Sequence, residues 1–120
     1  MKLMKRILIV MFFSLVTNFL IGQNEDAKMQ AQAQVEKVNS VISGIDPSLQ
    51  LSQNQIVKLE RLYMEKRLKI NELKTKNLYK NEFSVEAKKI EDNYKYAIDA
   101  VFTPDQKYAF YNRRKSLERQ

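Results

Sequence analysis

The sequence predicts an all-α fold of four helices, and the scarcity of helix-breaking residues is the first observation behind this prediction. Beyond residue 22, the 120-residue chain contains only Gly44, Pro47 and Pro104 as glycines and prolines. The stretch 48–103 has neither residue type and is rich in Leu, Lys, Glu, Gln and Ala, which favour helices. Apolar residues recur at steps of three and four instead of alternating, so helices are expected and strands are not.

The first two helices are expected on either side of the segment 44–47. The first should cover about residues 25–43, and Gly44 should end it in the left-handed conformation that glycine tolerates. Its apolar stripe consists of Ala31, Val35, Val38 and Ile42. The second should run from Ser52 to about Asn77, a length of about 39 Å at the helical rise. Its stripe consists of Ile56, Leu59, Tyr63, Ile70 and Leu73.

The third helix should follow a bend at about residues 77–84 and end near Val101, and the fourth should begin at Thr103. The third carries the most regular apolar stripe, Phe83, Ala87, Ile90, Tyr94, Ala97 and Val101. The second and third helices are expected to form a long antiparallel hairpin. Because such a hairpin is thin and leaves apolar surface uncovered, a homodimer is expected.

The first 22 residues have the organisation of a secretory signal peptide. Lys2, Lys5 and Arg6 precede an apolar run from residue 7 to residue 21, and the small residue Gly22 precedes a polar chain. At 15 residues, the run is shorter than the ~20 that a spanning helix needs. We expect residues 1–22 to be cleaved near Gly22, which leaves one exported helical domain, 23–120. An uncleaved membrane anchor is the alternative.

Removal of the leader reduces the positive charge of the chain. The whole chain has a net charge of +7, and the leader carries three basic residues and no acidic one, so the mature domain has +4. This weakens the case for a nucleic-acid partner. The absence of cysteine excludes disulfides, thiol redox chemistry and a lipid-modified cysteine anchor.

Composition gives no support for an enzyme, a cofactor or a metal site. The chain contains no histidine and no cysteine, so the usual general base and thiol nucleophile are missing. A single glycine in the mature domain cannot make a phosphate-binding loop. The mature domain keeps only two methionines, Met29 and Met64, so a transition-metal site would need carboxylates alone. Glu91 and Asp92 are too ordinary a pair to indicate one.

Two pentapeptides share one template, 51 positions apart: LSQNQ at residues 51–55 and FTPDQ at residues 102–106. In each, an apolar residue precedes a hydroxyl residue, and glutamine follows three positions later. This spacing predicts capping boxes that start the second and fourth helices. The residues concerned are Leu51, Ser52 and Gln55 in the first copy, and Phe102, Thr103 and Gln106 in the second.

The pair of pentapeptides, on either side of a basic helical segment in an exported chain, resembles the two LTxxQ motifs of the Spy/CpxP family. Serine replaces threonine in the first motif, and phenylalanine replaces leucine in the second. The resemblance implies a four-helix protomer that forms a thin, cradle-shaped periplasmic dimer. It also implies an ATP-independent chaperone that holds unfolded client proteins. A regulator that docks on the periplasmic part of an envelope-stress sensor kinase is the alternative.

Basic residues are in excess on the second helix, and they are the predicted client-binding surface. They are Lys58, Arg61, Lys66, Arg67, Lys69, Lys74 and Lys76. Positive charge would attract clients over a distance, and apolar groups would then hold them weakly. The alternative is that these residues are an ordinary solvated helix face. The aromatic and basic segment 108–115 could stack on nucleic-acid bases, but export argues against this. The preferred interpretation is that its aromatic residues pack on the hairpin and that its basic residues suit the C-terminal end of the helix. A weak contact with anionic lipid headgroups is a third possibility.

Overall fold

The computed structural model describes the backbone of residues 2–118 and the side chains of residues 24–118. It is all-helical, and no strand occurs in the part that it describes. The predicted fold class of four helices is therefore confirmed. The helices are α1 (Lys2–Ile45), α2 (Gln53–Lys74), α3 (Lys80–Asp99) and α4 (Pro104–Glu118), with a short 3-10 helix, η1 (Pro47–Leu49), between α1 and α2.

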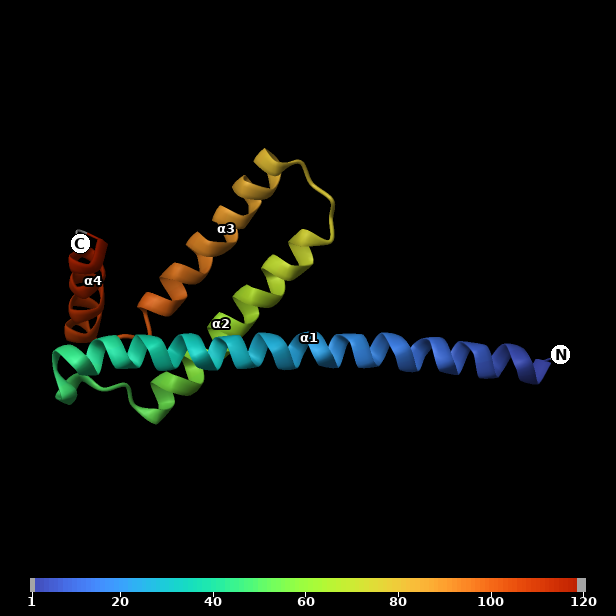
Figure 1. The fold of residues 1–120 in the computed structure, drawn as a ribbon, viewed down its shortest axis with the longest axis horizontal. Helices are drawn as coiled ribbons and strands as arrows, with labels where there is room; N and C mark the ends of the chain where they lie inside the picture. Colours follow the sequence, from blue (N-terminus) through green and yellow to red (C-terminus); the bar gives the residue numbers. More distant parts are fainter. Residues whose placement is uncertain (1, 119–120) are drawn as a thin grey trace.

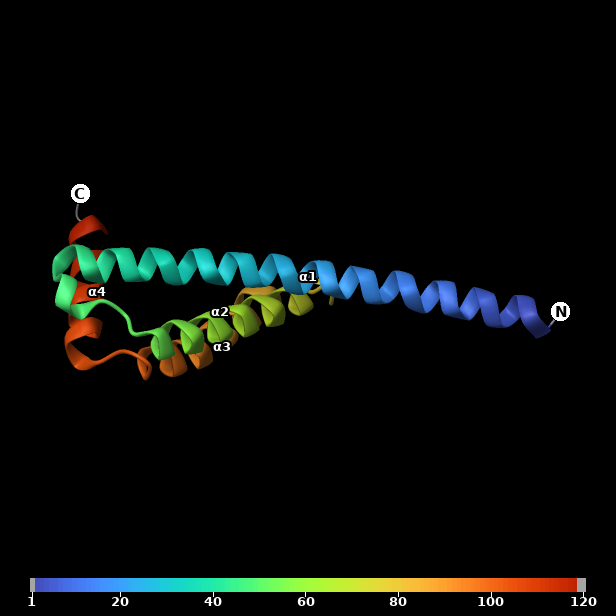
Figure 2. The same ribbon diagram turned by 90° about the horizontal axis from the view of Figure 1, so that it is seen from below.

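The molecule is elongated. Its extents are 68 × 36 × 24 Å and its radius of gyration is 19.5 Å, whereas a compact domain of this length would have about 14 Å. Figure 1 shows α1 as a straight rod whose N-terminal half projects beyond the other helices. The other helices gather around the C-terminal half of α1, and α2 and α3 run in opposite directions (Figures 1 and 2).

The predicted end of the first helix at Gly44 is wrong. Gly44 is helical, no glycine of the described residues has a positive φ, and α1 continues to Ile45. The chain leaves the helix at Asp46, which is extended (φ −149°, ψ 112°) because it precedes Pro47. The carboxylate of Asp46 accepts hydrogen bonds from the amide and hydroxyl of Ser48, which starts η1.

The predicted signal peptide is part of α1 from Lys2 onward, and the helix runs on from it without a break. The side chains around the predicted cleavage site near Gly22 lie outside the described residues. The first helix is therefore longer than the predicted span of 25–43, and its first buried side chain among the described residues is Ala27.

The turn between α2 and α3 is tighter and earlier than predicted. The second helix ends at Lys74 instead of Asn77, and α3 begins at Lys80, within the predicted bend. Asn77 adopts a left-handed conformation with φ 52°, which asparagine tolerates better than most residues. With 22 residues, α2 is about 33 Å long, shorter than predicted.

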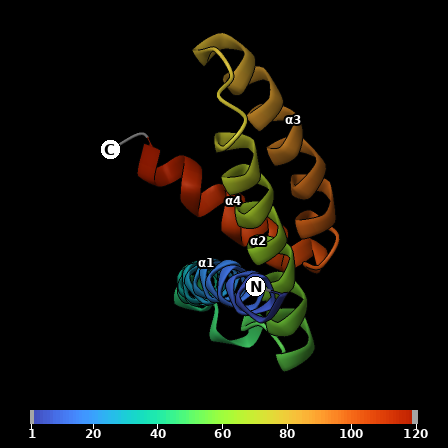
Figure 3. The same cartoon turned by 90° about the vertical axis from the view of Figure 1, so that its right-hand side faces the viewer.

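The core lies where α1, α2 and the segment before α4 meet. Its buried cluster contains Val35, Val38, Ile42, Leu51, Leu59, Ile98 and Phe102. The predicted stripe of the first helix is entirely buried, and Ala27 extends it. Small side chains at Ala27 and Ala31 allow a close helix approach, and α1 packs against α2, which crosses it in Figure 3.

The apolar stripe of the third helix is only partly covered. The residues predicted to form it, from Phe83 to Val101, are all half-buried, and the one buried residue of α3 is Ile98, outside that stripe. Periodicity correctly indicates an amphipathic helix but not the depth of its burial. The described chain alone does not bury this face.

Candidate functional site

The first pentapeptide opens α2 as a capping box. Ser52 is the N-cap, and its Oγ accepts a hydrogen bond from the amide of Gln55 at 3.2 Å. The Oε1 atom of Gln55 accepts in return from the amide of Ser52 at 2.9 Å. The box satisfies two amides near the start of the helix that have no carbonyl partner within it.

The second pentapeptide opens α4 in the same way. The Oγ1 atom of Thr103 accepts from the amide of Gln106 at 3.2 Å, and Oε1 of Gln106 accepts from the amide of Thr103 at 2.9 Å. Pro104 takes the first helical position, where its missing N–H is no loss. Asp105 places a negative charge in the first turn, which favours the positive end of the helix.

The two boxes are joined through the side chains of Gln55 and Gln106, which we call the glutamine pair. Nε2 of Gln55 donates to Oε1 of Gln106 at 2.7 Å, and Nε2 of Gln106 donates to Oε1 of Gln55 at 3.2 Å. The second N–H of Gln55 reaches the carbonyl of Val101, and that of Gln106 reaches the carbonyl of Leu49, each at 3.0 Å. Each carboxamide therefore makes four hydrogen bonds, its full capacity.

The glutamine pair explains how a polar side chain can be buried in this core. Gln106 is 4% exposed and is the buried polar side chain of the described core. Among the described residues, no buried side-chain nitrogen or oxygen lacks a partner. The pair fastens the start of α2 to the start of α4, which lie 51 residues apart.

The apolar residues of the motifs are core anchors. Leu51 and Phe102 are both buried in the same cluster. The ring of Phe102 stacks on that of Phe110 in α4 at a centroid distance of 6.1 Å. The amide of Leu51 donates to Oδ1 of Asn39 at 2.9 Å, so a side chain of α1 also holds the first motif.

Sequence reasoning did not identify the glutamine pair or Asn39. The capping roles of the two glutamines account for them locally, so nothing in the spacing of one motif points to the other. The repetition of the template is the signal that could have suggested a direct contact. The Asn39 contact has no sequence signal, since an asparagine in a helix is ordinary.

Six of the seven predicted basic residues are exposed, and Lys66 is half-buried. They do not form one continuous face. At 3.6 residues per turn, Lys58, Arg61 and Lys69 fall within about 80° of the circumference of α2. Arg67 and Lys74 lie roughly 160–180° from Lys58. We call these two groups the basic flanks.

The apolar face of α2 lies between the basic flanks, and Lys66 is on it. Lys76, the last of the seven, follows the C-cap of α2 and belongs to the turn. Nζ of Lys66 stands over the ring of Tyr63 at 5.8 Å, and Nζ of Lys69 stands over the ring of Tyr94 in α3 at 5.3 Å. These contacts are cation–π interactions that hold two of the cations beside aromatic surface.

Most of the positive charge is not neutralised within the chain. The ion pairs within 4.0 Å among residues 24–118 are Lys89 with Glu86 and Arg114 with Glu118. Neither involves a predicted client-binding residue. The basic flanks therefore keep their charge available to an external partner.

A second polar cluster joins α2, α3 and α4. The hydroxyl of Tyr111 donates to Oδ1 of Asp99. Burial, followed by this hydrogen bond and the Asp99 charge, raises the pKa of Tyr111 to about 12. Burial, followed by the charge of Asp99, also raises the pKa of Tyr63. Both tyrosines are neutral at physiological pH, and the hydroxyl of Tyr111 links α4 to the end of α3.

Two classes of site are not found within the part of the chain that the structure describes. No group of three or more carboxylates with the geometry of a metal site occurs there. None of the helices described combines the length and the apolar character that a membrane crossing requires.

The chain was also compared with known proteins. No protein-family model, no curated protein and no solved structure matches it.

Proposed function

We propose that this chain is an exported, ATP-independent chaperone that holds unfolded or partly folded proteins. The observation that carries the proposal is the surface of α2 and α3. There, exposed cations flank apolar side chains that the chain itself leaves half-covered. The likeness of the two pentapeptides to Spy/CpxP motifs supports the same function.

Exposed apolar side chains also support the proposal. Val57, Tyr79, Val85 and Tyr96 are each more than half exposed, and they lie on α2, on α3 or in the turn between them. An unfolded client exposes apolar side chains, and a surface of this kind would hold it without a deep pocket. Cations that form no ion pair with the described carboxylates would increase the rate at which a client binds, most strongly at low salt.

The proposed active form is a thin, cradle-like homodimer. Its support is the half-covered stripe of α3 together with the elongated shape of the chain. A second copy would bury part of this apolar surface.

The test is the aggregation of a chemically unfolded client, followed by light scattering in the absence of nucleotide. Near-stoichiometric amounts of the protein should suppress scattering. Replacement of Lys58, Arg61 and Lys69 by glutamine should weaken the suppression at low salt. The matched control replaces the acidic residues Glu60 and Glu65 by glutamine, which should not weaken it. No suppression at a several-fold excess would exclude the chaperone function.

The second candidate is a regulator that docks on the periplasmic part of an envelope-stress sensor kinase. The short, defined basic flanks would suit one acidic folded partner. A regulator would bind that partner in a fixed ratio and leave client aggregation unchanged.

A further inference from the structure

A hollow of about 650 Å³ lies among all four helices, away from the glutamine pair. Its floor is apolar: Val38, Ile98 and Phe102 are buried, and Val41 and Phe110 are half-buried. Small-molecule sites in proteins commonly enclose about 300–1,000 Å³ and have mostly apolar linings with a few polar groups. The hollow therefore has the size of a ligand site, and its lining combines an apolar part with several charged side chains.

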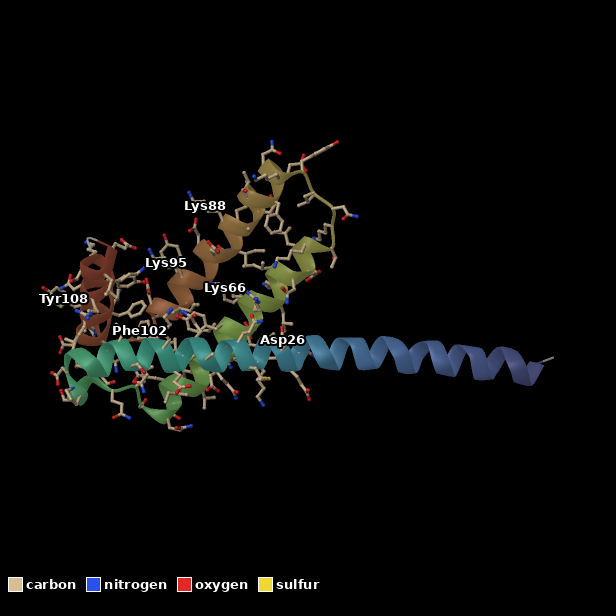
Figure 4. The ribbon with its side chains drawn as sticks, in the orientation of Figure 1. Asp26, Lys66, Lys88, Lys95, Phe102 and Tyr108 are labelled. Carbon is tan, nitrogen blue, oxygen red and sulfur yellow. The ribbon has the colours of Figure 1, made fainter. Side chains whose placement is uncertain are left out.

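The rim of the hollow carries one cation from each helix. They are Lys37 of α1, Lys66 of α2, Lys95 of α3 and Arg114 of α4. Nζ of Lys95 lies 5.8 Å from the centre of the Tyr111 ring, on the side of α3 that faces α4 (Figure 4). None of the three lysines has a carboxylate within 4.0 Å among the described residues, and Arg114 pairs only with the exposed Glu118.

Carboxylates on the rim limit the charge of the ligand. Glu91, Asp92 and Asp99 all come from α3, and Asp99 already accepts the hydroxyl of Tyr111. Four cations against three carboxylates leave a small positive excess, which suits one negative charge and not several. All three acids of the lining come from α3, and Lys66 and Lys95 already stand over tyrosine rings. Lys37 of α1 and Arg114 of α4 are therefore the rim cations left for an anionic group.

We propose that this hollow binds a free long-chain carboxylate. The acyl chain lies on the apolar floor, and the carboxylate meets Lys37 and Arg114 through charge-assisted hydrogen bonds. This site is independent of the proposed client-binding surface, because Lys66 is the one predicted client-binding residue that lines it.

Isothermal titration calorimetry tests the proposal, with dodecanoate as the probe below the concentration at which it forms micelles. The protein is used as it is recovered from the expressing cells. One dodecanoate per chain should bind, and the midpoint of thermal unfolding should rise. Acetate, which has the head without the chain, should give no heat, and dodecyltrimethylammonium should bind more weakly than dodecanoate.

Charge variants test the assigned residues. Replacing Lys37 and Arg114 by glutamine should weaken dodecanoate binding by about threefold per cation, the scale of one exposed ion pair. Replacing Glu91 and Asp92 by their amides should strengthen it. All four residues are exposed, so circular dichroism should show folded proteins. Equal affinities in these variants, or equal binding of the cationic amphiphile, would overturn the proposal.

Two further arms separate alternative outcomes. Val41→Glu places a carboxylate on the floor and should abolish binding while the rim is intact. Flotation with phosphatidylglycerol vesicles tests whether the anion that these cations bind is a lipid headgroup on a membrane surface. Flotation without one-to-one dodecanoate binding would show a lipid-surface contact and would overturn the free-carboxylate site.

Discussion

At the scale of single residues, Gln106 is the buried member of the glutamine pair, and its side chain makes four hydrogen bonds. It caps α4, contacts Gln55 and donates to the carbonyl of Leu49. Gln106→Ala should lower the free energy of unfolding by roughly 2–4 kcal/mol, because buried partners lose their hydrogen bonds. Urea unfolding followed by circular dichroism measures this. Gln53→Ala, at an exposed position in the first turn of α2, is the control and should change little.

A charged replacement at the same position should make stability depend on pH. In Gln106→Glu, a carboxylate can accept hydrogen bonds but cannot donate to Leu49 or to Gln55. Folding therefore favours the protonated acid and raises its pKa above the unfolded value of about 4.3. The variant should be closest to wild type below that pH and should lose stability as the pH rises through the folded pKa. A stability difference that does not change between pH 4 and 8 would contradict this account.

The Tyr111 hydroxyl gives a prediction at the alkaline end. Its folded pKa of about 12 lies above the ordinary value, so the unfolded chain releases this proton first as pH rises. Its contribution to stability is complete below the unfolded pKa and is lost as pH rises through the folded pKa. Wild type should therefore lose more stability than Tyr111→Phe between pH 9 and 11. Urea unfolding at both pH values measures the difference, and equal losses would argue against the Asp99 contact.

At the scale of the helices, the packing of α2 on α1 depends on a few buried side chains. Leu59 is 0% exposed and belongs to the central cluster. Leu59→Ala should lower the free energy of unfolding by about 2–5 kcal/mol, since it removes buried methyl groups and leaves a cavity. Val57→Ala, on the same helix at 56% exposure, is the matched control and should cost far less. Similar losses for both would show that α2 does not pack as described.

The starts of α2 and α4 could be predicted from the sequence, whereas the start of α3 and the ends of α1 and α2 could not. Ser52 and Thr103 start their helices through contacts within four residues, which a local pattern contains. Gly44 was expected to end the first helix, but its conformation follows from the next residues, where Asp46 and Pro47 force the chain out of the helix. A helix end that depends on several neighbouring residues cannot be predicted from one residue type alone.

Tertiary contacts account for what the sequence did not predict in the candidate site. The exposure of the basic residues follows from composition, but their division into two flanks follows from the orientation of α2. The glutamine pair joins residues 51 positions apart, and each glutamine already has a complete local role. The rim of the hollow likewise contains one cation from each helix, and the sequence pattern of a single helix does not predict such a group.

At the scale of the whole molecule, the uncovered stripe of α3 leads to a prediction about assembly. Sedimentation equilibrium of the purified protein should give twice the mass of a single chain. Ile90→Glu, on the half-buried stripe, should shift the protein toward the monomer because it places a charge on the proposed contact face. Glu91→Gln, its exposed neighbour, is the control and should remain dimeric. A wild-type protein that sediments as a compact monomer would exclude the dimer.

The reciprocal hydrogen bonds of the glutamine pair also constrain how this chain can change over evolutionary time. A first substitution at either position leaves the other carboxamide with an unsatisfied donor and acceptor, whereas a second substitution removes those unsatisfied groups. The two positions should therefore show strong epistasis, with the single variants less fit than a repacked double variant. Gln55 and Gln106 should therefore coevolve, and homologues of this chain should have both glutamines or neither.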